Sequence, residues 1–250
     1  MSILIVYLLL LVHIVLHEAG HAYAMRKAGV RVVEAGLGLA LPPRLSFATR
    51  KGFRWSLSIW LLGAYVKPHA DDWGKIEKAP YKAAAWQFNA GIVINLGLGC
   101  AGLAAGHALQ GHLLVAAGWA LGAVLTAAFP KIVAAYVFPA IGPFALIFFL
   151  WSFAGSVNAG ATVGITGLAE VAPANPTLSV MLRLFGALGL AIAVLNAVPL
   201  MPLDNGRVWD RLLHGWFGHR VARVYQATGL GTMGAIMLYA LFTDVLNIAT

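Results

Sequence analysis

Apolar residues run in long stretches along most of this chain, and shorter segments between them hold most of the charged residues. The first stretch, from Ser2 to about Ala24, has the roughly 20 residues that a transmembrane helix needs. From Ala83 to Pro130 no Asp, Glu, Lys or Arg occurs, and a segment at 106–112 with glycines and histidines divides this stretch in two. This pattern predicts a helical hairpin.

Three more apolar stretches predict further spans, from about Ile132 to Phe153, Leu178 to Leu203 and Val224 to Leu246. The connection through Pro176 is rich in Gly, Asn, Thr and Pro, which is typical of a loop or a broken helix. We therefore predict an all-α polytopic membrane protein with about six transmembrane helices. A cleavable signal peptide is the alternative for the first stretch, but that stretch lacks a basic start and its apolar core is too long.

Between Arg31 and Lys82 the pattern changes to prolines, scattered charges and alternating residues such as those from Phe53 to Ile59. Alternation of this kind, bounded by turn residues, is typical of short strands. We expect a small membrane-associated β-rich segment at 31–82, after the first helix and within a single domain that covers 1–250. The other polar stretches are too short for a separate soluble domain.

Composition supports a membrane protein, because 60% of the residues are hydrophobic and 10% are charged, against about 25% charged in soluble domains. The formal net charge of +8 could indicate nucleic-acid binding, but the basic residues gather at the ends of apolar stretches, at 26–82 and 207–223. Under the positive-inside rule both segments face the cytoplasm. We expect a multi-pass protein of the cell membrane with both termini outside and no nucleic-acid partner.

The motif His17-Glu18-Ala19-Gly20-His21 places two imidazoles four residues apart, on one face of the first predicted helix. This spacing lets both rings bind one metal ion, and zinc accepts imidazole nitrogen readily. Glu18 lies next to the first histidine, where its carboxylate can take a proton from water. Three ionisable groups inside a membrane span need a compensating partner such as a metal, which favours a metal site over a pair of surface histidines.

A catalytic zinc ion keeps three protein ligands, and the single cysteine, Cys100, cannot build such a site. The candidates for the third ligand are Asp204, Asp244, Glu170 and the remaining histidines. Asp204 ends the fifth predicted span, at the same predicted depth as the two histidines of the motif. Its alternative role is a helix cap or an ion pair with Arg207.

The first motif, together with the segment from Asn196 to Arg207, resembles the site-2 protease family of intramembrane metalloproteases. Gly63 to Lys67 resembles the membrane-associated β-segment of that family, and Phe88 to Asn95 resembles its second-helix motif. Together these matches cover most of the chain. The sequence departs from the family at Asn205, usually glycine, and at Ile92, usually proline, which concerns loop geometry and substrate fit more than chemistry.

The resemblance implies that Asp204 is the third ligand of one Zn²⁺ ion per chain, that Glu18 is the general base, and that Asn95 orients substrate or stabilises the oxyanion. Asn196, the other amide in a predicted span, is a second candidate for that role. Both amides could equally serve helix packing. His13 lies one turn before the first ligand, and we expect it to support that ligand or to pack.

The predicted strands have a physical purpose, because a transmembrane helix hides its scissile carbonyls in its own hydrogen bonds until it unwinds. An exposed strand edge can hold an unwound substrate by β-augmentation. We predict this role for the segment from Phe53 to Val66, with Tyr65 as a substrate-binding residue. A structural hairpin at the membrane surface is the alternative.

The sequence therefore predicts an intramembrane zinc metalloendopeptidase that hydrolyses peptide bonds within or next to transmembrane segments, as in regulated intramembrane proteolysis. Its expected partners are transmembrane protein substrates and the lipid bilayer, and an accessory membrane protein is one means of selecting substrates. The active site is expected towards the cytoplasmic side. The alternatives are an inactive relative that binds membrane proteins, for which Glu18 has no purpose, and a metal-binding transporter, which needs polar residues along several helices.

Overall fold

The computed structural model describes residues 2–38, 42–50, 52–59, 63–158 and 177–249. Most of the predicted connection through Pro176, including Glu170, lies outside these residues, and so does the side chain of Asp244. The elements are α1 (Ser2–Lys27), β1 (Val32–Leu37), β2 (Arg44–Ala48), β3 (Arg54–Ser58), β4 (Ala64–Pro68), η1 (Ala70–Asp72), α2 (Trp73–Glu77), α3 (Tyr81–Ala108), α4 (Leu113–Ala128), α5 (Pro130–Ile132), η2 (Val133–Val137), α6 (Phe138–Asn158), α8 (Leu178–Ala197) and α9 (Asp204–Ala249).

Four helical segments are long and apolar enough to cross a membrane, namely Leu4–Lys27, Tyr81–Ala108, Pro130–Gly155 and Leu178–Ala197. The second helix of the predicted hairpin is the shorter apolar helix α4. The last predicted span lies in α9, which Gly218 divides with a non-helical backbone. The prediction of an all-α polytopic membrane protein with about six spans and a small β-rich segment after the first helix is confirmed in its main features. The four candidate membrane helices match four of the predicted spans, and the other two predicted spans lie in α4 and α9.

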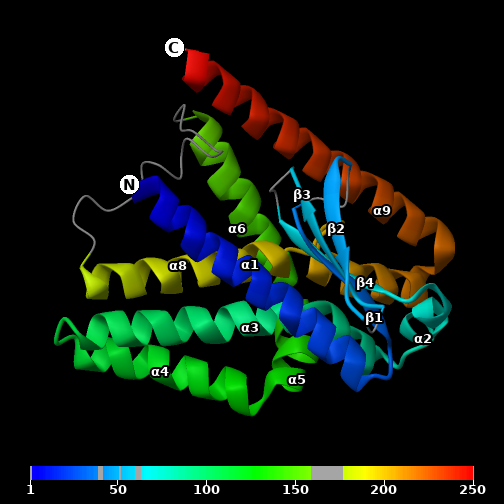
Figure 1. The fold of residues 1–250 in the computed structure, drawn as a ribbon, viewed down its shortest axis with the longest axis horizontal. Helices are drawn as coiled ribbons and strands as arrows, with labels where there is room; N and C mark the ends of the chain where they lie inside the picture. Colours follow the sequence, from blue (N-terminus) through cyan, green and yellow to red (C-terminus); the bar gives the residue numbers. More distant parts are fainter. Residues whose placement is uncertain (1, 39–41, 51, 60–62, 159–176, 250) are drawn as a thin grey trace.

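Helix α3 is at the centre of the helical part, where it packs against α1, α4, α8 and α9. Figure 1 shows α3, α4 and α8 side by side, with α1 crossing them and with α6 and the last part of α9 extending away from them. Close approach between α3 and α8 depends on small residues, because a Cβ atom added to Gly102 would lie 2.9 Å from the backbone of Gly186. Small residues at such contacts are typical of helix packing in membranes.

A π-helical turn, η2, interrupts the apolar helix that begins at Pro130. Such turns disturb the regular backbone hydrogen bonds. Two side chains of α3 donate hydrogen bonds to backbone carbonyl groups of η2. The hydroxyl of Tyr81 donates to the carbonyl of Ala135 at 2.9 Å, and the amide of Asn89 donates to that of Ala134 at 2.8 Å. Irregular backbone at membrane depth requires partners of this kind, so η2 is fixed against α3.

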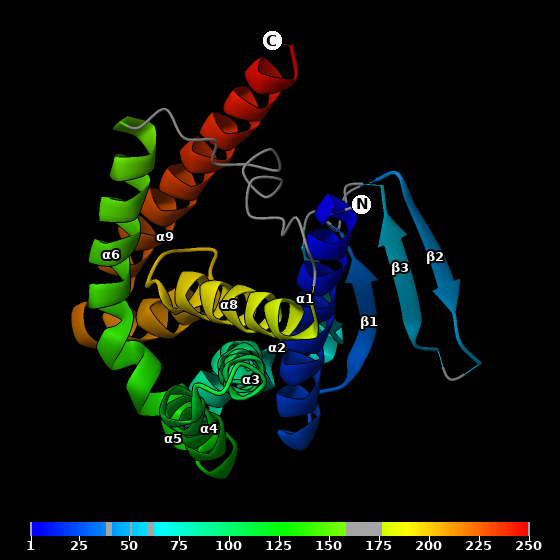
Figure 2. The same cartoon turned by 90° about the vertical axis from the view of Figure 1, so that its left-hand side faces the viewer.

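The strands form one sheet in the order β2-β3-β1-β4. β1 pairs in parallel with β3 and antiparallel with β4, and β2 pairs antiparallel with β3. Figure 2 shows the sheet on one side of α1, and β4 packs against that helix. The segment from Phe53 to Val66 contains β3, which is paired on both sides, and the first part of β4, which is an edge strand among the described residues. Within the predicted segment, β4 is therefore the strand whose free edge could pair with a substrate.

A buried carboxylate links all four strands of the sheet. Glu34 of β1 is 2% exposed and accepts hydrogen bonds from the hydroxyls of Tyr65 in β4, at 2.5 Å, and Ser56 in β3, at 2.7 Å. The guanidinium of Arg44 in β2 lies 3.3 Å away. Burial raises the pKa of Glu34, but the hydrogen bonds and the positive charge outweigh burial, so its pKa lies below the ordinary value.

A second buried carboxylate joins the sheet to the short helices that follow it. Asp72, which is 2% exposed, accepts hydrogen bonds from the backbone N–H of Arg31 at 2.8 Å and from its Nε at 2.9 Å. Lys75 pairs with the other carboxylate oxygen at 2.8 Å. Hydrogen bonds from Arg31 and Lys75 hold the pKa of Asp72 well below its usual range. The start of β1 is thereby fixed to the start of α2.

Candidate metal centre

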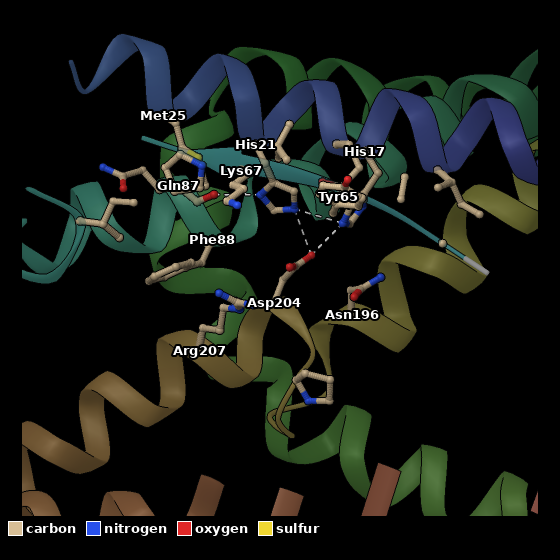
Figure 3. A pocket seen from close by; sticks show the side chains of 18 of the residues that line it. His17, His21, Met25, Tyr65, Lys67, Gln87, Phe88, Asn196, Asp204 and Arg207 are labelled. Atoms are coloured by element: carbon tan, nitrogen blue, oxygen red, sulfur yellow. Dashed lines mark hydrogen bonds and ion pairs between the residues drawn. The ribbon is translucent and has the colours of Figure 1, made fainter. Parts of the chain in front are cut away.

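His17 and His21 lie on one face of α1, and their Nε2 atoms are 3.1 Å apart. Asp204, the first residue of α9, points towards both rings in Figure 3. Its Oδ2 lies 2.7 Å from Nε2 of His17 and 3.2 Å from Nε2 of His21. In the described part of the chain these three side chains form the one group of His, Cys, Asp and Glu residues arranged to hold a metal ion.

The position of Asp204 depends on its neighbour in the chain. Asn205 is fully buried, and its amide nitrogen donates to the carbonyls of Ala197 at 2.7 Å and Phe138 at 3.0 Å. Its oxygen accepts a hydrogen bond from Asn89 at 3.3 Å. Asn205, where the sequence departs from the family pattern, thus anchors the start of α9 to α8, α6 and α3. It lies next in sequence to Asp204, whose carboxylate faces the histidines.

The ring of His17 is backed by a chain of buried polar groups. The carboxamide of Asn95 lies between Nδ1 of His17, at 3.0 Å, and Nδ1 of His13, at 3.4 Å. Nε2 of His13 lies 2.8 Å from the carbonyl oxygen of Phe185, which can only accept, so this nitrogen carries the hydrogen. Both His13 and Asn95 are fully buried.

These hydrogen-bonded groups, His13 and Asn95, determine which nitrogen of His17 carries a hydrogen. A neutral His13 with hydrogen on Nε2 accepts at Nδ1, so the NH₂ group of Asn95 must face His13. A half-turn of the Asn95 carboxamide, which exchanges its nitrogen and oxygen, places the nitrogen towards His13 and the oxygen towards His17. The amide oxygen then accepts the Nδ1 hydrogen of His17, and Nε2 of His17 keeps a free lone pair.

His21 is held in the same tautomer by the backbone of α3. Its Nδ1 lies 2.8 Å from the carbonyl oxygen of Gln87, so Nδ1 donates and Nε2 of a neutral ring has a free lone pair. Gly91 makes room for both rings, since a Cβ atom there would lie 2.5 Å from Nε2 of His21 and 2.6 Å from Nε2 of His17. The backbone of α3 therefore lies directly against the two histidines.

The donor set fits a zinc ion. With both histidines carrying hydrogen on Nδ1, two ring nitrogens and a carboxylate oxygen converge as three lone-pair donors within 3.2 Å of one another. A metal cation between them would satisfy all three donors at once. Two imidazoles and one carboxylate are a known ligand set for catalytic zinc, which keeps a fourth position for water. His17, His21 and Asp204 are the residues that would hold it.

A cavity of about 650 Å³ opens beside these three residues. Glu18 lines this cavity and is half-buried. Asn196 and Arg207 also line it, and Figure 3 shows them on either side of Asp204. Residues 63–68, which include all of β4, form another wall. The cavity thus brings together a carboxylate that can accept a proton, the three donors and the edge strand.

The predicted substrate contacts differ in their positions. Tyr65 and Asn196 line the cavity, but the hydroxyl of Tyr65 donates to Glu34 and the amide nitrogen of Asn196 donates to the carbonyl of Ile192 at 3.1 Å. Asn95 contacts the nitrogen of the first ligand that points away from the aspartate. A direct contact with substrate stays a prediction for all three residues.

The structure also gives roles to residues that the sequence did not assign. Gln87 orients one histidine through its backbone carbonyl, Asn89 bonds to both η2 and Asn205, and Gly91 gives the rings space. For Asn89 and Asn205 a signal existed, because polar amides within or beside apolar helices need partners. A backbone carbonyl gives no signal at all in the sequence.

The family model described as Peptidase family M50 matches residues 5–240, which is nearly the whole chain. The family expected from the two motifs is confirmed by this match. The matched range includes Glu18 and the three residues that converge at the candidate metal centre. Among curated proteins, none matches the chain.

Proposed function

The chain belongs to peptidase family M50, the site-2 protease family, and we propose that it is an active intramembrane zinc metalloendopeptidase. Its substrates are transmembrane proteins, which it cleaves within or next to their membrane-spanning segments. One observation carries the proposal: His17 and His21 meet Asp204 across 187 and 183 positions of sequence, in a cavity that also holds Glu18.

Zinc bound to His17, His21 and Asp204 would polarise a peptide carbonyl and make water more acidic. Glu18, which shares the cavity with these ligands, takes the proton of the attacking water and delivers it to the leaving nitrogen. The amide nitrogen of Asn196 has two hydrogens and donates one to the backbone carbonyl of Ile192 in its own helix. The second can bind a carbonyl oxygen of the substrate.

Substrate is held at β4, the edge strand of the sheet. A transmembrane helix must unwind before water can reach its peptide bonds, and an unwound segment has free N–H and C=O groups that can pair with a strand edge. β4 lines the same cavity as Glu18, so a segment added to β4 passes beside the ligands. Tyr65 supports the strand through its bond to Glu34.

The protein is an integral membrane protein, as its apolar helices and family indicate. We propose in addition that it lies in the cell membrane with the sheet and the active site towards the cytoplasm. The basic segments 26–82 and 207–223 support this orientation under the positive-inside rule. An accessory membrane protein is a further way in which substrates could be brought to β4.

Zinc content tests the ligand set without knowledge of the substrate. We expect about one zinc ion per chain in detergent-purified protein and a loss of zinc in His21→Ala and Asp204→Ala, as for a catalytic site with three ligands. His112→Ala, which removes an exposed histidine, is the matched control and should keep its zinc. Folded wild-type protein that takes up no zinc after reconstitution would contradict the proposal.

Activity then separates an enzyme from an inactive relative. Wild-type protein and Glu18→Gln would be reconstituted in vesicles with model transmembrane substrates. We expect Glu18→Gln to keep its zinc while cleavage slows by about 10² to 10⁴, the usual contribution of a general base. If Glu18→Gln cleaves as fast as wild type, Glu18 is not the base.

A further inference from the structure

A second cavity, of about 780 Å³, lies between the end of α1, the start of α3 and the segment formed by α5 and η2. Figure 1 and Figure 2 both show the end of α1 and α5 at the bottom of the molecule. The cavity shares no lining residue with the one beside the candidate metal centre. The proposed protease chemistry makes no use of it.

Three lysines from three different elements line this second cavity: Lys27 is the last residue of α1, Lys82 is the second residue of α3, and Lys131 lies in α5. No Asp or Glu is among the described residues that line it. Two of the ammonium groups lie over aromatic rings, 5.6 Å from the ring centres of Tyr23 and Tyr136 respectively. The described lining of the cavity therefore gathers positive charge and includes no carboxylate to balance it.

The first turn of α3 adds to this positive charge. The turn contains no acidic residue, and no side chain caps it, so the positive end of the helix dipole lies uncompensated beside the lysine that this turn contributes. A basic residue at a helix N-terminus is unfavourable by itself. An anion in the cavity would offset both the dipole and the three ammonium groups.

The cavity also lies where a lipid headgroup would reach it. Each of the three lysines stands at or beside the end of an apolar helix, which is the depth at which long basic side chains extend to the membrane surface. Trp86, Pro130 and Ile132 supply an apolar part of the lining. Phosphate recognition beside an apolar wall is the combination that an anionic lipid requires.

We propose that this second cavity binds the phosphate group of an anionic membrane lipid, with Lys27, Lys82 and Lys131 as its ligands. The lipid contacts α1 and α3 at residues that do not line the cavity beside the candidate metal centre. Because the contacts between α1 and α3 also position the histidines, a bound lipid stabilises the helix pair that carries the site. The inference does not depend on the chain being an active protease.

The test measures binding of short-chain lipids to the detergent-purified full chain by native mass spectrometry. The probes are dioctanoyl phosphatidylglycerol, dioctanoyl phosphatidylcholine and inorganic phosphate, compared in wild type and in a triple variant with Lys27→Gln, Lys82→Gln and Lys131→Gln. The control is a second triple variant, Arg50→Gln, Lys78→Gln and Arg220→Gln, which removes the same charge from exposed positions outside the cavity. Elution as a single species in size-exclusion chromatography checks that both variants fold.

We expect wild type and the control variant to bind one phosphatidylglycerol in preference to phosphatidylcholine. The triple lysine variant should bind phosphatidylglycerol more weakly by on the order of 100-fold, since each basic residue near an anionic surface contributes about fivefold. Equal binding in all three proteins, or an equal loss in the control, would overturn the site. Competition by inorganic phosphate at the affinity of the lipid would overturn its assignment to lipid.

Discussion

At the scale of single residues, the chemistry of the centre depends on which ring nitrogens carry hydrogen. A histidine binds zinc only through a nitrogen without hydrogen, and the other nitrogen must then donate to an acceptor. His21 donates to a backbone carbonyl that no substitution can remove. His17 depends instead on the side chain of Asn95, so the two ligands differ in how they respond to mutation.

Replacing Asn95 by leucine should therefore weaken zinc binding. Leucine has a similar size but offers no acceptor to Nδ1 of His17, and loss of such an orienting partner typically costs 10-fold to 100-fold in metal affinity. Asn95→Asp keeps an acceptor and should bind zinc more tightly than Asn95→Leu. The measurement is competition with a zinc chelator of known affinity, and equal affinities for the two variants would contradict the role given to Asn95.

The close contact between Gly91 and the two histidine rings leads to a second prediction about zinc affinity. Its substitution by alanine would place a methyl group against both rings and push their Nε2 atoms out of position, so we expect zinc affinity to fall by about tenfold or more. Gly97→Ala is the control on the same helix, because its Cβ atom would lie 3.6 Å from Thr126, an ordinary contact. If both alanine variants bind zinc as wild type does, α3 is not packed against the ligands as described.

At the scale of elements, β4 is the part of the sheet that can act on substrate. Tyr65→Pro removes a backbone N–H from β4 and should abolish cleavage while bound zinc stays unchanged. Tyr65→Phe keeps the strand and removes only the hydroxyl that donates to Glu34, so it should retain most of the activity. Cleavage and zinc content are measured on the same preparations, and full cleavage by Tyr65→Pro would exclude β-augmentation at this strand.

The Glu34 cluster makes the stability of the sheet depend on pH. The pKa of Glu34 is lower in the folded protein than its ordinary value of about 4.3. Its carboxylate therefore contributes stability in full above that value, and the contribution is lost as the pH falls through the folded pKa. Wild type should become less stable below about pH 4, and Glu34→Gln should show a smaller change. Thermal unfolding between pH 3 and 7, about the range in which carboxylates titrate, would measure both, and parallel curves would contradict this assignment.

The sequence predicted some elements and not others, for physical reasons. Long apolar stretches and the spacing of His17 and His21 are local patterns, so the membrane helices and the motif were predictable. The π-helical turn at η2 was not, because it depends on partners in α3 such as Asn89. The sheet order was not predictable either, since the pairing of β1 with β3 skips a strand. Asp204 could be proposed as a ligand only from depth and resemblance, because its position depends on Asn205.

At the scale of the whole molecule, the candidate centre joins segments from the two ends of the chain. α1 and α9 share few contacts elsewhere, and His17 and Asp204 meet there at 2.7 Å. Zinc that binds only the folded protein stabilises it by about 2.7 kcal/mol when the zinc concentration is 100 times Kd.

Removing zinc with a chelator should therefore lower the Tm of wild type. The Tm of His21→Ala should be lower from the start and should not change when the chelator is added. His112→Ala should respond as wild type does. A wild-type Tm that stays constant while zinc is shown to leave would mean that α1 and α9 are held together without the metal.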